Sequence, residues 1–309
     1  MILCIGTTPA AQRVMVFGKL ELDCVNRAHQ TCDGIAGKSI NVAKVLTTLG
    51  SRAIAAGFLG GDSGAAILKQ LRARGITTHF ISVAPATRQC LTVIDESGQT
   101  VTELVEESRP VAPENYESLE TIVQGLLPGC QAVVMSGSLT PGGPVDFYRK
   151  ITNLANSHRI QSIVDAQGPP LVQALEAGPG LVKPNRQELG ATVGHALGTE
   201  SEVITAMKEV QRRGAARVVV TAGKSPALAL DGEDLWRIHP PQVKAVNAIG
   251  SGDAFTAGLV WRLLQGESLG QSCRWAAASG AANALNVMPG EVDPKEIERL
   301  AAEVVVEKL

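Results

Sequence analysis

The chain has 309 residues, of which 45% are apolar and 19% are charged, and its 28 Lys and Arg nearly balance its 30 Asp and Glu. This composition excludes a disordered chain, and the length allows one large α/β domain or two smaller ones. No long run of like charge occurs in the near-neutral sequence. We therefore expect no nucleic acid and no membrane surface as a partner.

The cysteines and the first residues bear on the cellular compartment. Six cysteines are widely spread without a C-x-x-C pair, which favours reduced thiols. The chain opens on an apolar run without a preceding basic segment, and no apolar run reaches the roughly 18 residues that span a bilayer. These features predict a cytoplasmic protein that is neither exported nor anchored.

In chain order, short apolar runs alternate with segments of helical period. The runs that predict buried strands are residues 2–6, 53–59, 132–135, 162–165, 180–183, 217–221 and 227–230. The segments that predict helices include residues 39–49, 64–74, 145–157, 202–213 and 253–264. This alternation is typical of a mainly parallel sheet with helices on both faces. The sequence therefore predicts an α/β fold.

Two stretches break the alternation, at about residues 13–35 and 88–107. In the second, polar and apolar residues alternate on both sides of a turn at residues 96–99, which predicts a hairpin with one solvated face. We expect both stretches to lie outside the main sheet, as a small β-lid on a single domain of residues 1–309.

Two glycine-rich runs are candidate phosphate sites. Gly37-Lys38-Ser39 looks like the end of a P-loop, but that pattern needs glycine where Cys32 stands, and no buried strand precedes it. The run Gly250-Ser251-Gly252-Asp253 opens an apolar helix, whose free first N–H groups attract an anion. Asp253 there is either a capping carboxylate, worth roughly 0.3–1 kcal/mol, or the base of a phosphoryl transfer.

The order of motifs along the chain resembles that of the PfkB, or ribokinase-like, carbohydrate kinases. Residues 250–253 resemble the G-A-G-D signature of that family, and residues 37–43 and 57–64 resemble its two N-terminal glycine motifs. Further matching blocks are S-G-S-L-T-P-G at 136–142, K-P-N-R-Q-E-L at 183–189 and T-A-G at 221–223. Their forms are similar to the 1-phosphofructokinase and tagatose-6-phosphate kinase branch, whose members phosphorylate sugars that already carry a phosphate. The resemblance implies a ribokinase-like three-layer sandwich.

The resemblance also implies ATP and Mg²⁺ as cofactors. Asp253 would take the proton of the acceptor hydroxyl, while the amides of Gly250, Ser251 and Gly252 would hold the charge of the γ-phosphate. Asn185 and Glu188 would organise Mg²⁺ through its waters. The other implied nucleotide-binding residues are Lys183, Thr221, Gly223 and, beside the adenine, Asn283.

For the acceptor sugar, the resemblance implies a separate set of residues. Arg88 and Arg27 would neutralise the phosphate that the sugar already carries, a task that suits a guanidinium. The remaining implied sugar-binding residues are Gln12, Gly37, Lys38, Asn41 and Ser138. The five histidines belong to no motif, and we expect them to be solvated or structural.

This sequence departs from the family pattern on the acceptor side. The branch usually has N-P-A-x-D where this chain has Thr8-Pro9-Ala10-Ala11-Gln12, so a neutral glutamine replaces an aspartate that holds sugar hydroxyls. Ala36 and Ser39 replace two glycines of the next motif, and we expect their side chains to reshape the sugar pocket. The motifs for ATP and catalysis show no comparable change.

Together these observations predict an ATP-dependent kinase that acts on a primary hydroxyl of a sugar phosphate of the fructose 1-phosphate or tagatose 6-phosphate type. A kinase of an unphosphorylated sugar or nucleoside is the alternative within the fold. A non-catalytic sugar-phosphate sensor is the alternative outside enzymes, and intact Asp253, Asn185 and Glu188 argue against it. Members of the family often pair through their lids, and an exposed hairpin edge would allow a homodimer here.

Overall fold

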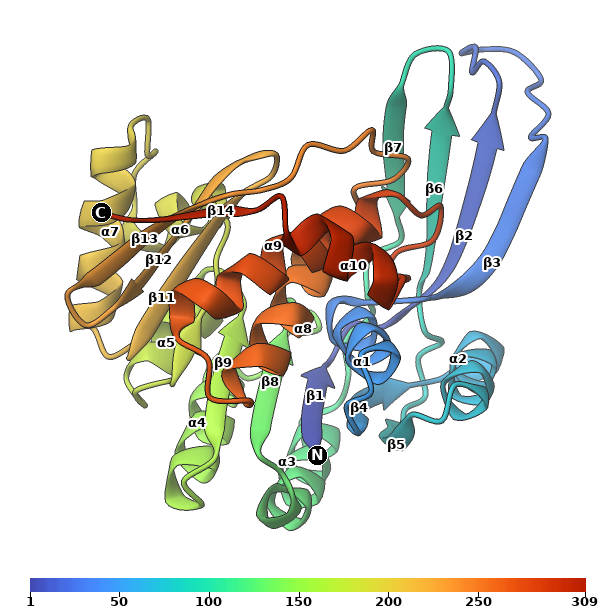
Figure 1. Ribbon diagram of the computed structural model, residues 1–309. Helices are drawn as coiled ribbons and strands as arrows, with labels where there is room; N and C mark the ends of the chain where they lie inside the picture. The colour runs from blue at the N-terminus through green and yellow to red at the C-terminus, as the bar shows by residue number, and fades with distance from the viewer.

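A sheet of ten strands crosses the molecule in the order β14-β13-β12-β11-β10-β9-β8-β1-β4-β5 (Figure 1). The computed structural model describes all residues, 1–309. The strands of this main sheet are β1 (Ile2–Gly6), β4 (Ala53–Leu59), β5 (Thr77–Ser82), β8 (Ala132–Ser136), β9 (Gln161–Asp165), β10 (Leu181–Val182), β11 (Arg217–Ala222), β12 (Ser225–Asp231), β13 (Asp234–His239) and β14 (Val305–Lys308). Neighbours from β5 to β11 are parallel, and only β12, β13 and β14 are added antiparallel. The predicted mainly parallel sheet is confirmed.

Helices cover both faces of the main sheet because its central strands are apolar on both sides. In β1, Ile2 and Cys4 enter one hydrophobic cluster, whereas Leu3 and Ile5 enter the other. The first cluster packs under α1 (Lys38–Thr48), α2 (Gly61–Ala73), α8 (Ser251–Leu263), α9 (Leu269–Ala284) and α10 (Pro294–Ala301). The second packs under α3 (Pro113–Leu126), α4 (Phe147–Ser157), α5 (Pro169–Leu175), α6 (Arg186–Val193) and α7 (Glu200–Arg212). The result is the expected three-layer sandwich.

The lid is a second sheet of four strands in the order β3-β2-β6-β7. Its strands are β2 (Ala10–Phe17), β3 (Gln30–Ala36), β6 (Gln89–Asp95) and β7 (Thr100–Val105). The predicted hairpin is β6 and β7, joined by a turn at Glu96–Gln99. Val14, Val16 and Ile94 form a small apolar cluster on one face, while every residue of β7 is exposed. In Figure 1 the lid stands to the upper right of the main sheet.

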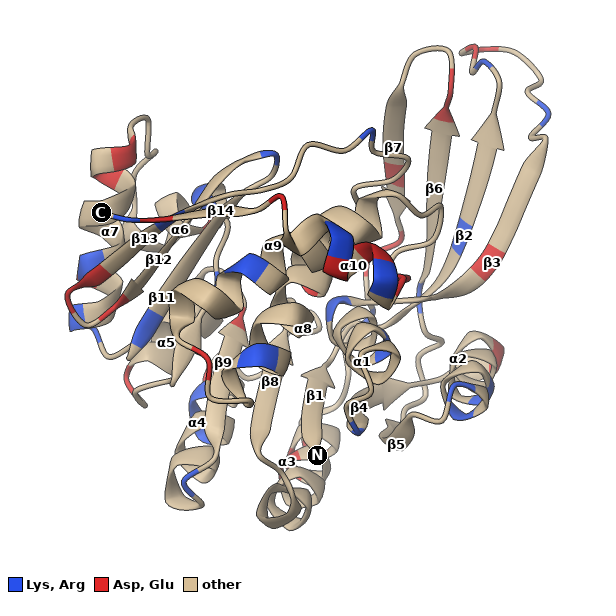
Figure 2. Ribbon diagram, in the orientation of Figure 1, with Lys and Arg blue, Asp and Glu red and all other residues tan.

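The predicted strands and helices agree with the structure to within three residues at their starts, except that β10 is only two residues long. Strands β5, β13 and β14 were not predicted, because they lie toward the sheet edges and alternate or expose their residues instead of burying a continuous apolar run. None of the helices is both long and apolar enough to cross a membrane. Figure 2 shows Lys and Arg interspersed with Asp and Glu over the elements of both sheets.

Candidate active site

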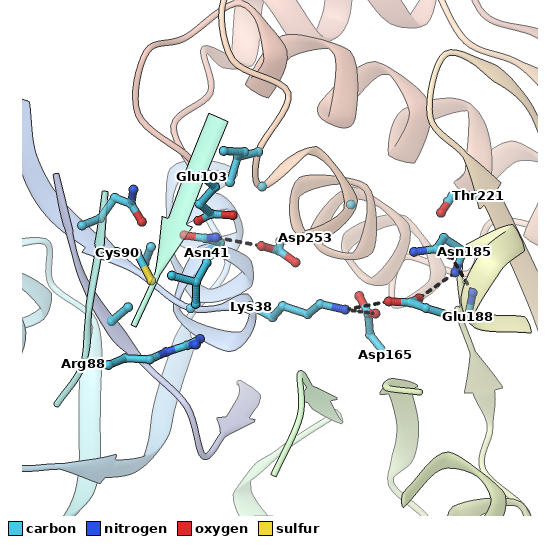
Figure 3. A pocket seen from close by; sticks show the side chains of 18 of the residues that line it. Lys38, Asn41, Arg88, Cys90, Glu103, Asp165, Asn185, Glu188, Thr221 and Asp253 are labelled. Atoms are coloured by element: carbon cyan, nitrogen blue, oxygen red, sulfur yellow. Dashed lines mark hydrogen bonds and ion pairs between the residues drawn. The ribbon is translucent and has the colours of Figure 1, made fainter. Parts of the chain in front are cut away.

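A polar cavity of about 340 Å³ lies between the lid and the carboxyl ends of the central strands. In open parallel sheets this edge is where ligands bind. Figure 3 shows side chains from lid strands, from α1 and from the ends of the main sheet converging on it. The lining residues are Ala10, Gln12, Ala36, Gly37, Lys38, Asn41, Arg88, Cys90, Glu103, Val105, Asp165, Lys183, Asn185, Glu188, Thr221, Ile249, Gly250, Gly252 and Asp253. Most of the predicted catalytic and sugar-binding residues are therefore brought together.

Asp253 lies in the first turn of α8, at the wall of this cavity. The helix begins there because Gly250 adopts a left-handed conformation, with φ of 83°, and lets the chain turn sharply into it. Asp253 is buried, and Asn41 Nδ2 donates a hydrogen bond to its Oδ2 at 2.7 Å. Burial raises the pKa of Asp253 to about 6, although Lys38 and the bond from Asn41 oppose the rise. A carboxyl with this pKa is ionised at neutral pH and still accepts a proton readily.

The backbone amides at the N-terminus of α8, from Gly250 to Gly252, are not equivalent. Ser251 N donates to Ala248 O at 3.1 Å, so this amide is already used within the protein. The amides of Gly250 and Gly252 have no protein acceptor within hydrogen-bond distance. The N-terminus of α8 therefore offers the free N–H groups of Gly250 and Gly252 to a negatively charged group. Ser251 lines the neighbouring cavity.

A buried ion network lies beside Asp253, centred on Asp165 at the end of β9. Asp165 contacts Lys183 Nζ at 3.1 Å and Lys38 Nζ at 3.3 Å, and it accepts a hydrogen bond from Thr256 Oγ1 at 2.9 Å. Burial alone would raise the pKa of Asp165, but Lys183 and Lys38 outweigh it and lower the pKa. Asp165 in turn raises the pKa of Lys38. The side-chain nitrogens of Lys38 and Lys183 thus lie together on the cavity wall, on either side of Asp165.

Asn185 and Glu188 form the N-terminal cap of α6. Asn185 Oδ1 accepts from Glu188 N at 2.8 Å, and Glu188 Oε2 accepts from Asn185 N at 2.8 Å, which is a capping box. The other oxygen, Glu188 Oε1, lies 3.4 Å from Lys38 Nζ. No group of three or more His, Cys, Asp or Glu side chains that would hold a metal ion is found. The donors suit a hydrated Mg²⁺ held mainly by ligand phosphates, because Mg²⁺ keeps several of its waters.

The lid contributes neutral and charged polar groups to the same cavity. Gln12 Nε2 donates to Thr92 Oγ1 at 2.9 Å, whereas its buried Oε1 has no partner. Arg88 Nη2 donates to Thr8 O at 3.1 Å, which holds the guanidinium at the cavity edge. Glu103 of the exposed strand β7 lies above Asn41 in Figure 3, and partial desolvation of its carboxyl at the cavity raises the pKa of that group. An unpaired buried acceptor such as Gln12 Oε1 favours binding of a hydroxyl donor.

Three residues lie elsewhere than the sequence led us to expect. Arg27 is exposed in the loop between β2 and β3 and does not line the cavity. Ser138 is also exposed, and its carbonyl accepts hydrogen bonds from the Thr7 and Thr8 hydroxyls. Ser39 does not line the cavity either, since its side chain packs against Gly6, where an added Cβ would meet Ser39 Oγ at 2.2 Å. The expectation that Ser39 reshapes the pocket is therefore wrong, while Ala36 does line it.

Asn283 is fully buried and supports the loop before α8 from behind. Its Nδ2 donates to Ile249 O at 2.9 Å and to Ser251 Oγ at 3.2 Å, and its Oδ1 accepts from Gly290 N at 2.7 Å. All hydrogen-bonding groups of this side chain are used within the protein, and it lines neither cavity. Asn283 is thus placed to hold the loop in position.

A second cavity, of about 560 Å³, opens next to the first and is more apolar. Its walls include Phe255 of α8 and the small residues Ala277, Gly280 and Ala281 of α9, which leave a slot between the helices and the Pro240-Pro241 segment. Thr221, Gly223 and Ser251 line its polar side. Both cavities share Asn185, Thr221 and Gly252. A flat apolar group with a charged tail fits the slot, with the tail reaching Gly252, which both cavities share.

Comparison with known proteins decides the family. The model of the pfkB family carbohydrate kinases matches residues 1–295. The chain belongs to this family. It is 28% identical over 309 residues to a tagatose-6-phosphate kinase of Staphylococcus epidermidis, covering 99% of both chains. The crystal structure of Escherichia coli phosphofructokinase-2 in complex with fructose-6-phosphate superposes with a TM-score of 0.86 at 27% identity, covering 97% of this chain and 98% of the other.

The fold class is confirmed by a structure of Arabidopsis thaliana ribokinase, which superposes with a TM-score of 0.75 at 17% identity over 97% of this chain and 98% of the ribokinase. The chain is therefore a carbohydrate kinase of the pfkB family with a ribokinase-like fold, and ATP as phosphate donor is what the family implies. The larger, apolar cavity is the one that suits a nucleotide base, and the smaller, polar cavity suits a sugar.

Three residues of this pfkB kinase site escaped the sequence analysis. Asp165 was seen only as the last residue of a buried strand, and a charged side chain at that position is itself a signal, because parallel strands end at the ligand-binding edge. Glu103 and Cys90 were assigned to the lid hairpin but not to the site. Their position on the cavity face follows from the register Gln12–Cys90–Val105, which no local pattern reveals.

Proposed function

We propose that this kinase transfers the γ-phosphate of ATP to a primary hydroxyl of a sugar phosphate of the fructose 1-phosphate or tagatose 6-phosphate type. The observation that carries the proposal is the position of Asp253, whose carboxyl lies in the polar cavity next to Gly252, where the two cavities meet. A base at this junction can reach a sugar hydroxyl on one side and the end of a nucleotide on the other.

In the proposed reaction, the sugar hydroxyl loses its proton to Asp253 as its oxygen forms a bond to the γ-phosphorus of ATP. The bond from that phosphorus to the bridging oxygen breaks, and ADP leaves. The free amides of Gly250 and Gly252 and the ammonium groups of Lys38 and Lys183 would stabilise the negative charge on the transferred group. Asp253 returns its proton to solvent after the product leaves.

Mg²⁺ bound to the phosphates would add further charge stabilisation, and we propose that Glu188 holds it through water. The oxygen of Glu188 that is not part of the capping box is the available contact. Asn185 positions this carboxylate through the reciprocal hydrogen bonds of the cap. The role of Asn185 toward the metal is then indirect.

On the sugar side, we propose that Arg88 binds the phosphate that the acceptor already carries. Support comes from its position at the cavity edge and from two relatives. One is named a tagatose-6-phosphate kinase, and the structure of the other, phosphofructokinase-2, is a complex with fructose-6-phosphate. Gln12 Oε1 would accept a hydrogen bond from a sugar hydroxyl. Arg27, in contrast, would reach a bound sugar only if its loop moved or if a second chain supplied it.

One observation favours the second candidate, a kinase of an unphosphorylated sugar. Glu103 places a carboxylate in the same cavity as Arg88 and would repel a phosphate bound near it.

Arg88→Ala separates the two candidates. With a sugar-phosphate acceptor, the variant should lose at least about tenfold in kcat/KM, as expected for loss of a charge-assisted contact. With a neutral acceptor, it should lose little.

The experiment that tests the proposal is ADP release from Mg-ATP with fructose 1-phosphate, tagatose 6-phosphate, fructose 6-phosphate, fructose and ribose. We expect turnover with one of the sugar phosphates, and Asp253→Asn should reduce it by at least about 10²-fold. Turnover with fructose or ribose but with none of the three sugar phosphates would refute the sugar-phosphate assignment. ADP release that is equal with and without every acceptor would refute the proposal.

Pairing of two chains through the lid stays a prediction. Large apolar side chains are exposed on β7 and in the loop between β2 and β3, namely Leu22, Val25, Val101, Leu104 and Val105. Exposed apolar residues on an edge strand favour pairing with another chain. Sedimentation of the wild type and of a Leu104→Lys variant would show whether this edge is used.

A further inference from the structure

Lys44 of α1 is buried in a place where no substrate reaches. Only 2% of the residue is exposed, and it does not line either cavity. Its ammonium group has three partners: Pro289 O at 2.7 Å, Ile35 O at 3.4 Å and Glu291 Oε1 at 2.9 Å. A lysine is rarely buried to this extent unless it is paired, and here two backbone carbonyls accept its hydrogen bonds while one carboxylate balances its charge.

The partners of Lys44 belong to two segments that are distant in sequence. Ile35 lies in β3 of the lid, whereas Pro289 and Glu291 lie in the turn at residues 287–291, between α9 and α10. The two segments also touch directly, because an added Cβ on Gly34 would meet Met288 Cε at 2.5 Å. Lys44 therefore connects lid strand β3 to the turn at residues 287–291.

The turn at residues 287–291 also packs against residues 249–252, which carry the free amides. An added Cβ on Gly250 would meet Pro289 Cβ at 2.8 Å and Gly290 N at 3.2 Å. Gly290 N donates to Asn283 Oδ1 at 2.7 Å, and Asn283 Nδ2 donates to Ile249 O at 2.9 Å. A shift of the turn would therefore move the loop.

The same turn also packs against the residue that holds Asp253. An added Cβ on Gly290 would meet Asn41 Oδ1 at 2.9 Å and Asn41 Cα at 3.0 Å. Asn41 Nδ2 donates the hydrogen bond of 2.7 Å to Asp253. The contacts around Gly290 leave no room for a side chain, so the position of Asn41 depends on that of the turn.

We propose that Lys44 is a positioning residue that ties lid strand β3 to the loop at Gly250 and to Asp253, and thereby couples acceptor binding under the lid to the alignment of the base and the free amides. This inference rests on the proposed phosphoryl transfer. The competing role for Lys44 is to neutralise Glu291, which Arg74 Nη2 also contacts at 2.8 Å. The positioning role depends on the carbonyls of Ile35 and Pro289, whereas the neutralising role depends on the carboxylate of Glu291.

The test uses Lys44→Met and the double variant Lys44→Met/Glu291→Met. The single variant leaves Glu291 without its buried partner and is expected to be less stable. The double variant removes both charges, so its melting temperature should return toward that of the wild type. Its kcat at saturating substrates should nevertheless stay roughly 10²-fold low, because the ties to Ile35 O and Pro289 O remain broken and the reacting groups are misaligned. The KM for ATP should change little, since Lys44 lies outside the nucleotide cavity.

Recovery of kcat together with the melting temperature in the double variant would overturn the proposal, because Lys44 would then serve only to neutralise Glu291. Lys69→Met on the exposed face of α2 is the matched control and should leave kcat unchanged.

Hydrogen exchange gives a readout that does not depend on activity. In the double variant, amide exchange should become faster both at residues 249–252 and in β3. Unchanged exchange in both segments would also overturn the coupling. A wild type that is inactive with every acceptor would instead refute the proposed function, while the exchange result would still decide the role of Lys44.

Discussion

Asp253→Asn is expected to make the protein more stable at neutral pH. Burial raises the pKa of Asp253 to about 6, from 3.8 for an exposed aspartate. Because the folded-state pKa lies above the unfolded one, the folded protein binds the proton more tightly, and ionisation of Asp253 destabilises the fold as pH rises from about 4 to 6. A difference of about 2 pKa units corresponds to roughly 3 kcal/mol at pH 7.5. Asparagine avoids this cost and can still accept the hydrogen bond from Asn41.

Urea denaturation at two pH values measures the effect. The variant should be more stable than the wild type by up to roughly 3 kcal/mol at pH 7.5, and the gain should fall to about half at pH 5, where Asp253 is mostly protonated in the folded protein. Asp165→Asn is the matched control from the same cavity. In the wild type, Lys183 and Lys38 outweigh the effect of burial and lower the pKa of the Asp165 carboxyl. The Asp165→Asn variant loses these favourable interactions and should therefore be less stable than the wild type at pH 7.5. Equal stability of Asp253→Asn and wild type at both pH values would refute the reasoning.

Further predictions concern catalysis and the two cavities. In the wild type, kcat/KM should fall about tenfold per pH unit below about pH 6, because the base becomes protonated, and a profile that stays flat down to pH 5 would contradict a base with the pKa of Asp253. Ala281→Leu should fill the apolar slot and raise the KM for ATP by at least roughly tenfold with a much smaller effect on the KM for the acceptor, as measured by initial rates against each substrate. Glu103→Gln should change the ratio of kcat/KM between sugar-phosphate and neutral acceptors in favour of the sugar phosphate, because it removes a negative charge from the cavity, and an unchanged ratio would show that Glu103 does not contact the acceptor.

The main sheet could be predicted where its strands are buried on both faces. Strands β1 and β4 were located to the residue, because every position in them is apolar or small and buried. Strands β13 and β14 could not be found in this way, since they form an exposed antiparallel edge where polar and apolar residues mix. The lid hairpin was predictable, because its alternation and turn are local.

The site could be predicted only in part, for the same physical reason. Asp253 and the capping box of Asn185 and Glu188 are contained in short runs, so the sequence alone brings their members together. Asp165 meets Lys38 across 127 positions of the chain, and no local pattern reports such a contact. Ser39 shows the opposite error. Because it replaces a glycine of a family motif, its side chain was expected to reshape the sugar pocket, whereas the direction of that side chain on α1 turns it toward Gly6.

The most direct test of the central claim is to compare wild type and Asp253→Asn for ADP release from Mg-ATP with tagatose 6-phosphate and fructose 1-phosphate. The two proteins should share the same fold by circular dichroism, and the variant should be at least as stable as the wild type at pH 7.5. We predict turnover of a sugar phosphate by the wild type and a loss of at least about 10²-fold in the variant. A variant that retains the wild-type rate would contradict the role of Asp253 as the base.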